Sequence, residues 1–225
     1  MNKPAQGVSD PLDPSNFTRT ESHPTVCALR ALNVLYARVW HRLDVASPCS
    51  LPRSGAAILV CNHTSGLDPS LLQSVCPRLI RWMMAKEFYD ARGAGWIYRA
   101  IGAIPVARSG RDLAATRVAM RALSNGHVLG VFPEGRIAPS HDLMPFQAGV
   151  ALLAIKSGAA VYPVRLDGTQ RGPSMRRALI GRQRAVIGFG PEIQFDRAST
   201  TRDNLDRATQ AIQQAVEQII LRRRE

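Results

Sequence analysis

Short apolar runs alternate with amphipathic stretches along most of this chain, and this alternation constrains the fold more than any other feature. It is typical of βαβ units, in which parallel strands are joined through helices. The first clear run, Ala56–Cys61, ends directly at a polar segment, as a buried strand does where it leaves a sheet. The sequence predicts strands at Ala56–Cys61, Ile80–Ala85, Ile104–Val106, Val128–Phe132, Ala160–Arg165 and Ala185–Phe189.

Helical patterns fill much of the sequence between and after these runs. The longest places Leu205, Ile212, Val216 and Ile219 on one apolar stripe and polar residues on the other face, as in a helix packed against a core. We therefore expect an α/β domain over residues 51–225, with a mostly parallel central sheet flanked by helices. The helices are predicted at Pro69–Val75, Arg111–Ser124, Phe146–Ser157 and Arg202–Arg223.

The N-terminal residues differ in character from this domain. Residues 1–24 carry four prolines and little that could form a core, so we expect a disordered arm, and they lack the apolar region of a signal peptide. Over residues 25–47, apolar side chains including Leu29, Tyr36 and Leu43 fall at helical spacing among several arginines. The pattern fits either an amphipathic helix in a membrane interface or a helix packed on the domain. No apolar stretch reaches 18 residues, so we expect a peripheral protein at the cytoplasmic face of a membrane.

The formal net charge of +12 indicates an anionic partner. Nucleic acid, an anionic lipid surface and phosphorylated substrates are all consistent with it. Aromatic residues make up only 6% and no nucleic-acid-binding motif is present, so a nucleic-acid-binding protein is the more remote alternative. The cysteines have neither zinc-ligand nor CxxC spacing, so we expect reduced, mostly buried thiols and no metal site. They are Cys27, Cys49, Cys61 and Cys76.

A histidine and an aspartate, His63 and Asp68, follow the first apolar run with four residues between them. On a helix this spacing would turn the two side chains apart, because neighbours on a helix lie three and four residues apart. A tight loop brings them together instead. Gly66 permits a sharp turn, and Asp68 followed by Pro69 is typical of a helix N-cap and first helical residue. The sequence predicts that His63 and Asp68 meet on a loop between a strand and a helix.

Three further segments combine apolar strands with glycine, proline or charged residues. The segment from Gly102 ends at Arg108, the segment from Phe132 contains Glu134 and Arg136, and the fourth is Val161–Val164. Three of the four segments place polar residues just past the carboxyl end of a predicted strand. Open α/β sheets bind their ligands at that edge.

In this order, the four segments resemble the motifs of the glycerolipid acyltransferase family. The resemblance covers roughly residues 51–190 and implies a glycerol-3-phosphate acyltransferase-like fold. It implies transfer of a fatty acyl group from acyl-CoA or acyl carrier protein to the free hydroxyl of a lysophospholipid, with no cofactor. The sequence departs from many relatives at Pro105 and at Arg136-Ile137, and it lacks their long N-terminal membrane helices. The matched segments are Asn62–Asp68, Gly102–Arg108, Phe132–Gly135 and Val161–Val164.

The resemblance also implies roles for single residues. His63 would be the general base that removes the hydroxyl proton, since imidazole changes protonation near neutral pH, and Asp68 would orient it. Arg108 would hold the phosphate of the acceptor, because a planar guanidinium matches phosphate oxygens. Glu134 would orient the glycerol backbone. The remaining substrate-binding residues are Asn62, Gly135 and Arg136.

Several alternatives stay open at this point. Asp68 is also consistent with a plain helix cap, Glu134 with a structural carboxylate paired to Arg136 or Arg108, and both arginines with solvated surface positions. The acceptor is most simply 1-acyl-sn-glycerol 3-phosphate, but the Arg136 variant also fits re-acylation of lysophosphatidylethanolamine or a lyso-ornithine lipid, and the His63–Asp68 pair also fits a thioester hydrolase. A basic cluster suits an anionic membrane, coenzyme A phosphates, acyl carrier protein or solvent. It comprises Arg171, Arg176, Arg177, Arg182 and Arg184.

Overall fold

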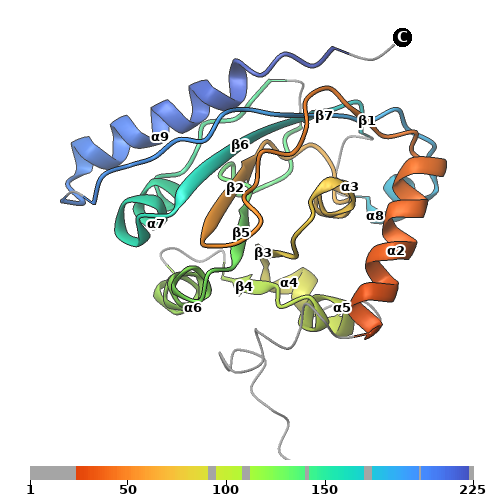
Figure 1. Cartoon of the computed structure of the whole chain (residues 1–225), viewed down its shortest axis with the longest axis horizontal. Helices are drawn as coiled ribbons and strands as arrows, with labels where there is room; N and C mark the ends of the chain where they lie inside the picture. Colours follow the sequence, from red (N-terminus) through yellow and green to blue (C-terminus); the bar gives the residue numbers. More distant parts are fainter. Residues whose placement is uncertain are drawn as a thin grey trace, which may run out of the picture.

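A single mixed sheet organises the protein. The computed structural model describes residues 24–90, 95–107, 112–139, 142–169, 174–197 and 199–222. The strands in these residues are β1 (Asp44–Val45), β2 (Ala57–Cys61), β3 (Ile80–Ala85), β4 (Ile104–Val106), β5 (Val128–Val131), β6 (Ala160–Asp167) and β7 (Val186–Phe189). They are ordered β1-β7-β6-β2-β5-β3-β4, and only β6 and β7 pair antiparallel (Figure 1). The predicted α/β class and mostly parallel sheet are confirmed.

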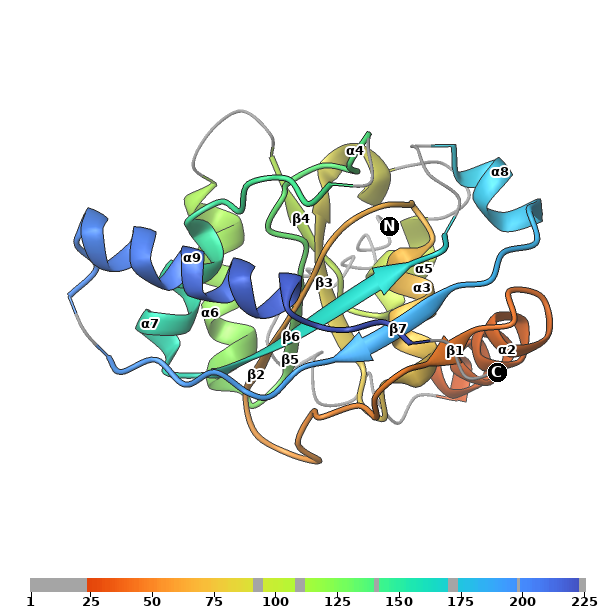
Figure 2. The ribbon, with the colours of Figure 1, turned by 90° about the horizontal axis from the view of Figure 1, so that it is seen from above.

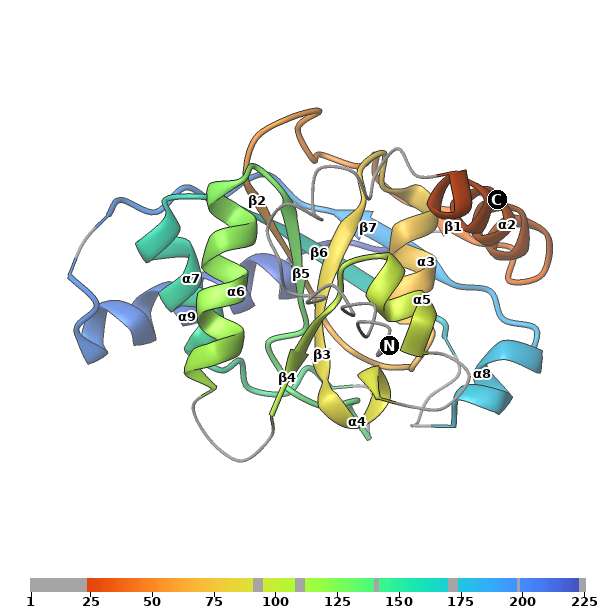
Figure 3. The same ribbon diagram turned by 90° about the horizontal axis from the view of Figure 1, so that it is seen from below.

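Helices lie on both faces of this sheet. Those in the described residues are α2 (Pro24–Val39), α3 (Asp68–Val75), α4 (Lys86–Tyr89), α5 (Gly95–Ala100), α6 (Leu113–Ser124), α7 (Gly149–Ser157), α8 (Met175–Ile180) and α9 (Arg202–Glu217). Helices α6, α7 and α9 cover one face, while α2 and α3 lie on the other (Figures 2 and 3). Within the described chain, no helix combines the length and apolarity needed to cross a membrane.

The burial of the central strand β2 explains why its sequence is apolar at every position. Ala57, Leu59 and Cys61 pack into the core under α2 and α3, whereas Ile58 and Val60 pack into the core under α6, α7 and α9. All five side chains are fully buried. Successive strand residues point to opposite faces, so a strand covered on both sides needs apolar residues at every position.

The predicted helix over residues 25–47 is wrong in its last eight residues. Helix α2 ends at Val39, and the chain then reverses through Arg42, whose φ of 43° is the left-handed conformation. Asp44 then donates its backbone N–H to the carbonyl of Ala185, which adds β1 to the edge of the sheet beside β7. Pairing with β7, 142 residues further along the sequence, overrides the local helical spacing.

Helices α7 and α9 are also shorter than predicted. Helix α9 stops at Glu217, whose carbonyl accepts a hydrogen bond of 2.6 Å from the guanidinium of Arg165. Helix α7 starts at Gly149 and not at Phe146, whose N–H donates to the side-chain carbonyl of Gln213 on α9. The short helices α4, α5 and α8 were not predicted at all. The predicted arm at residues 1–24 falls almost wholly outside the described residues.

Candidate active site

The first motif lies where β2 ends, and its loop is fixed to the neighbouring strand β6. The side-chain amide of Asn62 donates to the carbonyl of Leu166 at 2.9 Å and accepts from its N–H at 2.8 Å. The hydroxyl of Thr64 lies 2.6 Å from that of Thr169, just past β6. Asn62 therefore uses its amide to hold the backbone of β6, a structural contact that its spacing in the sequence did not indicate.

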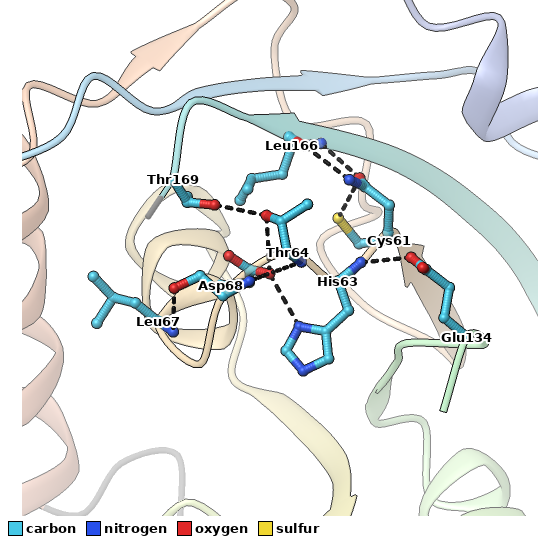
Figure 4. A network of polar contacts seen from close by, with 10 residues as sticks. Cys61, His63, Thr64, Leu67, Asp68, Glu134, Leu166 and Thr169 are labelled. Atoms are coloured by element: carbon cyan, nitrogen blue, oxygen red, sulfur yellow. Dashed lines mark hydrogen bonds and ion pairs between the residues drawn. The ribbon is translucent and has the colours of Figure 1, made fainter. Parts of the chain in front are cut away.

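His63 and Asp68 are in contact, as their spacing predicts. Nδ1 of the imidazole lies 3.0 Å from Oδ2 of Asp68, and the other ring nitrogen points away from the carboxylate (Figure 4). The Asp68 side chain is fully buried, whereas 17% of the His63 side chain is exposed. A buried carboxylate thus contacts one nitrogen of an imidazole that stays partly exposed.

The surroundings of Asp68 determine which nitrogen of His63 carries the proton. Oδ2 also accepts the backbone N–H groups of Thr64 at 2.7 Å and Ser65 at 2.8 Å. An ionised carboxylate only accepts hydrogen bonds, so Nδ1 of His63 must be the donor and Nε2 is left able to take a proton. The expected N-cap role of Asp68 is wrong by one position: Leu67 is the N-cap, and Asp68 is the first residue of α3.

Glu134 holds the backbone of His63 from the opposite side. Its carboxylate accepts the N–H of His63 at 2.7 Å and that of Met144 at 3.2 Å, and it is almost fully buried. Burial raises the pKa of Glu134, and the two backbone N–H groups oppose that shift. In addition, the N–H of Ala138 donates to the carbonyl of His63 at 2.7 Å. The segment between β5 and α7 thus binds both the N–H and the carbonyl of His63.

A stack of three rings supports the face of the imidazole. The His63 ring lies 4.0 Å from the ring of Phe132, at 16° between planes, and Phe132 lies 4.8 Å from Trp82 on β3. Trp82 reaches this position because Gly130 stands beside it on β5, where a Cβ atom would lie 2.4 Å from the indole. Sequence reasoning missed Trp82. The glycine inside the predicted strand was a usable signal, since it often marks a close approach.

Replacing Phe132 by leucine should lower kcat about 3–10-fold, because an aromatic pair is worth about 0.5–1.5 kcal/mol beyond its buried area and the imidazole would lose its supporting face. KM should change little. The matched control is Phe146→Leu, which alters a buried phenylalanine on the α6–α7–α9 side of the sheet. Steady-state kinetics and thermal unfolding would be measured for both variants. An equal loss of kcat in the two would contradict the role of the stack.

Two glycines of the motifs lie where a larger side chain would clash with a neighbouring residue. Gly135 has φ of +69°, and a Cβ atom there would lie 2.3 Å from the side-chain nitrogen of Gln147. Gly102, at the start of the second motif, has φ of +67°, and a Cβ atom would lie 2.0 Å from the buried guanidinium of Arg81. Both positions favour glycine because other residues rarely adopt this conformation.

The remaining predicted binding residues are not all gathered here. Arg136 is exposed, and Arg108 lies outside the described residues, so its proximity to His63 stays a prediction. A cavity of about 190 Å³ adjoins the loop and is lined by Asn62, Thr64 and Glu134, among others, but not by the His63 ring. This volume is below the range of about 300–1,000 Å³ usual for drug-sized ligands, so we assign the candidate site to the exposed part of the imidazole.

Comparison with known proteins identifies the class. A family profile described as Acyltransferase matches residues 42–167, which is 126 of the 225 residues and includes His63, Asp68 and Glu134. The chain therefore belongs to the acyltransferase family, and it is an acyltransferase enzyme.

Individual proteins of known name are similar to this chain. A 1-acyl-sn-glycerol-3-phosphate acyltransferase of Bacillus subtilis (strain 168) is 25% identical over 172 residues, covering 76% of this chain and 84% of that protein. One from Borreliella burgdorferi is 28% identical over 132 residues, covering 57% of this chain and 52% of that protein. The crystal structure of the 1-acyl-sn-glycerophosphate acyltransferase PlsC from Thermotoga maritima has a TM-score of 0.64 at 22% identity, covering 85% of this chain and 78% of that one. This likeness confirms the fold.

Proposed function

We propose that this acyltransferase moves a fatty acyl group from an acyl thioester to the free hydroxyl of 1-acyl-sn-glycerol 3-phosphate, giving phosphatidic acid. The thioester is acyl-CoA or acyl-acyl carrier protein. The observation that carries the proposal is the 3.0 Å contact between His63 and Asp68, with the second imidazole nitrogen turned away from the carboxylate. The names of the Bacillus and Borreliella relatives support the choice of acceptor.

In the proposed mechanism, Nε2 of His63 accepts the proton of the acceptor hydroxyl as its oxygen attacks the thioester carbonyl. Asp68 keeps the proton on Nδ1 and stabilises the imidazolium that forms. When the carbonyl re-forms, the C–S bond breaks and the thiolate leaving group takes the proton from Nε2. The acceptor's own hydroxyl is the nucleophile, so no acyl-enzyme is required.

A matrix of donors and acceptors tests this proposal. Purified protein with vesicles would be given acyl-CoA or acyl-acyl carrier protein, each with lysophosphatidate, lysophosphatidylethanolamine, a lyso-ornithine lipid or no acceptor. We expect phosphatidic acid from lysophosphatidate. Faster product formation from another lysolipid would instead support the re-acylation reading suggested by Arg136-Ile137. Thioester cleavage that is unchanged without acceptor would reject transfer in favour of hydrolysis.

We further propose that the protein binds anionic membranes through the α2–α8 surface. We define this surface by apolar side chains that are 41–69% exposed: Leu32, Leu35, Val39, Trp40, Leu179 and Ile180. The two helices are tied together, because the Tyr36 hydroxyl donates to the carbonyl of Leu179 and the Trp40 indole to that of Ile180. Exposed arginines surround the apolar residues: Arg38, Arg42, Arg177 and Arg182.

This combination suits a lipid surface better than a protein partner with an acidic face. Apolar side chains enter the boundary between headgroups and acyl chains, while each nearby arginine contributes on the order of 1 kcal/mol against anionic lipids. The guanidinium of Arg182 lies 5.8 Å from the centre of the Trp40 ring, which joins a cation to an aromatic residue of the kind found at membrane interfaces.

Flotation with anionic and neutral vesicles tests the α2–α8 surface. The variant Leu35→Asp should bind anionic vesicles about 10-fold or more weakly, because burying a leucine side chain is worth about 1.5–3 kcal/mol. The matched control is Leu113→Asp on α6, since both leucines are 61% exposed. Equal loss of binding in the two variants would rule out a specific role for this surface.

A further inference from the structure

Two cysteines far apart in the sequence meet beside the loop that precedes β2. The sulfur atoms of Cys49 and Cys76 lie 3.8 Å apart, although the residues are separated by 27 positions. Cys76 is buried and forms the C-cap of α3, while Cys49 is half-buried. The catalytic mechanism proposed above uses neither thiol.

We propose that Cys49 and Cys76 are an oxidation site, joined as a disulfide when the protein meets a disulfide-type oxidant such as oxidised glutathione. A disulfide has sulfur atoms about 2.05 Å apart, so the pair needs to close by less than about 2 Å. We expect side-chain rotation to close this distance. The inference departs from the expectation of permanently reduced thiols, which rested on sequence spacing alone.

The two sulfurs have different chemical environments. The hydrogen bond with Cys76 lowers the pKa of Cys49 to about 7, against the opposing effect of burial. The shared hydrogen bond and burial together raise the pKa of Cys76 far above its ordinary range. Burial also raises the pKa of Cys61, which is fully enclosed in the core. Because the thiolate is the nucleophile, Cys49 is the thiol that reacts first.

The chemistry balances with two glutathione thiols as products. The Cys49 thiolate attacks one sulfur of oxidised glutathione, forming a mixed disulfide and releasing one glutathione thiolate. That thiolate takes the proton of Cys76, whose sulfur then attacks the Cys49 sulfur and displaces the second glutathione as a thiolate, which takes from solvent the proton that Cys49 released on ionising. Two protein thiols lose two electrons in total, and one glutathione disulfide gains them.

The bond would tie the end of α3 to the chain just before β2. The two sulfurs are already in contact, so we expect the bond to leave Asp68, at the other end of α3, in place and activity unchanged. Closing a loop of this length should raise the Tm by about 5–10 °C, because the link restricts the unfolded chain.

The test uses the full chain treated with oxidised glutathione, then acid-quenched, unfolded and alkylated. We expect two of the four thiols to resist alkylation, a linked peptide containing Cys49 and Cys76, and the higher Tm. Cys27→Ser is the matched control, because Cys27 is exposed, and it should form the same link. Cys49→Ser should form no link and gain no Tm. The proposal is overturned if wild-type protein keeps Cys76 alkylatable, with glutathione retained on Cys27 or Cys49.

Discussion

Replacing His63 by alanine should lower kcat for acyl transfer about 10²–10⁴-fold, the usual contribution of a positioned general base. The fold should survive, because the variant keeps the two hydrogen bonds that the His63 backbone makes. Its N–H would still donate to Glu134 and its carbonyl would still accept from Ala138. Initial rates at saturating acceptor, together with thermal unfolding, would measure both effects.

The matched control for this variant replaces another histidine, which lies at the opposite end of the strands. His127 precedes β5, whereas His63 follows β2, so the two lie at opposite ends of neighbouring parallel strands. Burial lowers the pKa of His127 to about 4, so it is neutral at assay pH and His127→Gln should keep kcat. Near wild-type transfer by folded His63→Ala would reject His63 as the base.

Replacing Asp68 by asparagine should lower kcat by about 10²–10⁴-fold, because the imidazole loses the charge that stabilises its protonated form and fixes its tautomer. The fold should be weakened less than in Asp68→Ala. In the alanine variant the N–H groups of Thr64 and Ser65 lose their shared acceptor, and each buried group without a partner costs about 1–3 kcal/mol. Kinetics and denaturant unfolding of the two variants would separate catalytic from structural losses.

A double variant distinguishes action through His63 from an independent role of Asp68. If Asp68 works by orienting the imidazole, adding Asp68→Asn to His63→Ala should cause no further loss of kcat. Multiplicative losses in the double variant would show that Asp68 acts on the reaction by another route.

The sequence predicted the fold class and the His63–Asp68 contact because both follow from local patterns. Apolar runs such as Ala56–Cys61 report burial on both faces, and the spacing of His63 and Asp68 requires a loop. The catalytic roles of these two residues remain predictions, to be tested by the variants above.

What the sequence left undetermined depends on partners distant in the chain. The amide of Asn62 binds Leu166, 104 residues away, and Glu134 accepts backbone N–H groups that no side-chain pattern reveals. The conversion of residues 44–45 into β1 likewise requires β7. Local spacing describes one chain segment at a time, whereas these contacts arise only when the sheet places its strands in order.

The short strand β1 joins the N-terminal residues to the central sheet. Asp44 and Val45 pair with Val186 and Ile187, so the chain that leaves α2 forms the outermost strand of the sheet. Deleting residues 1–50 would strip the backbone N–H and C=O groups of β7 of these partners and create an open edge that invites aggregation. Helix α2 therefore cannot move independently of the sheet. A bilayer that bound α2 would fix the orientation of the whole catalytic domain.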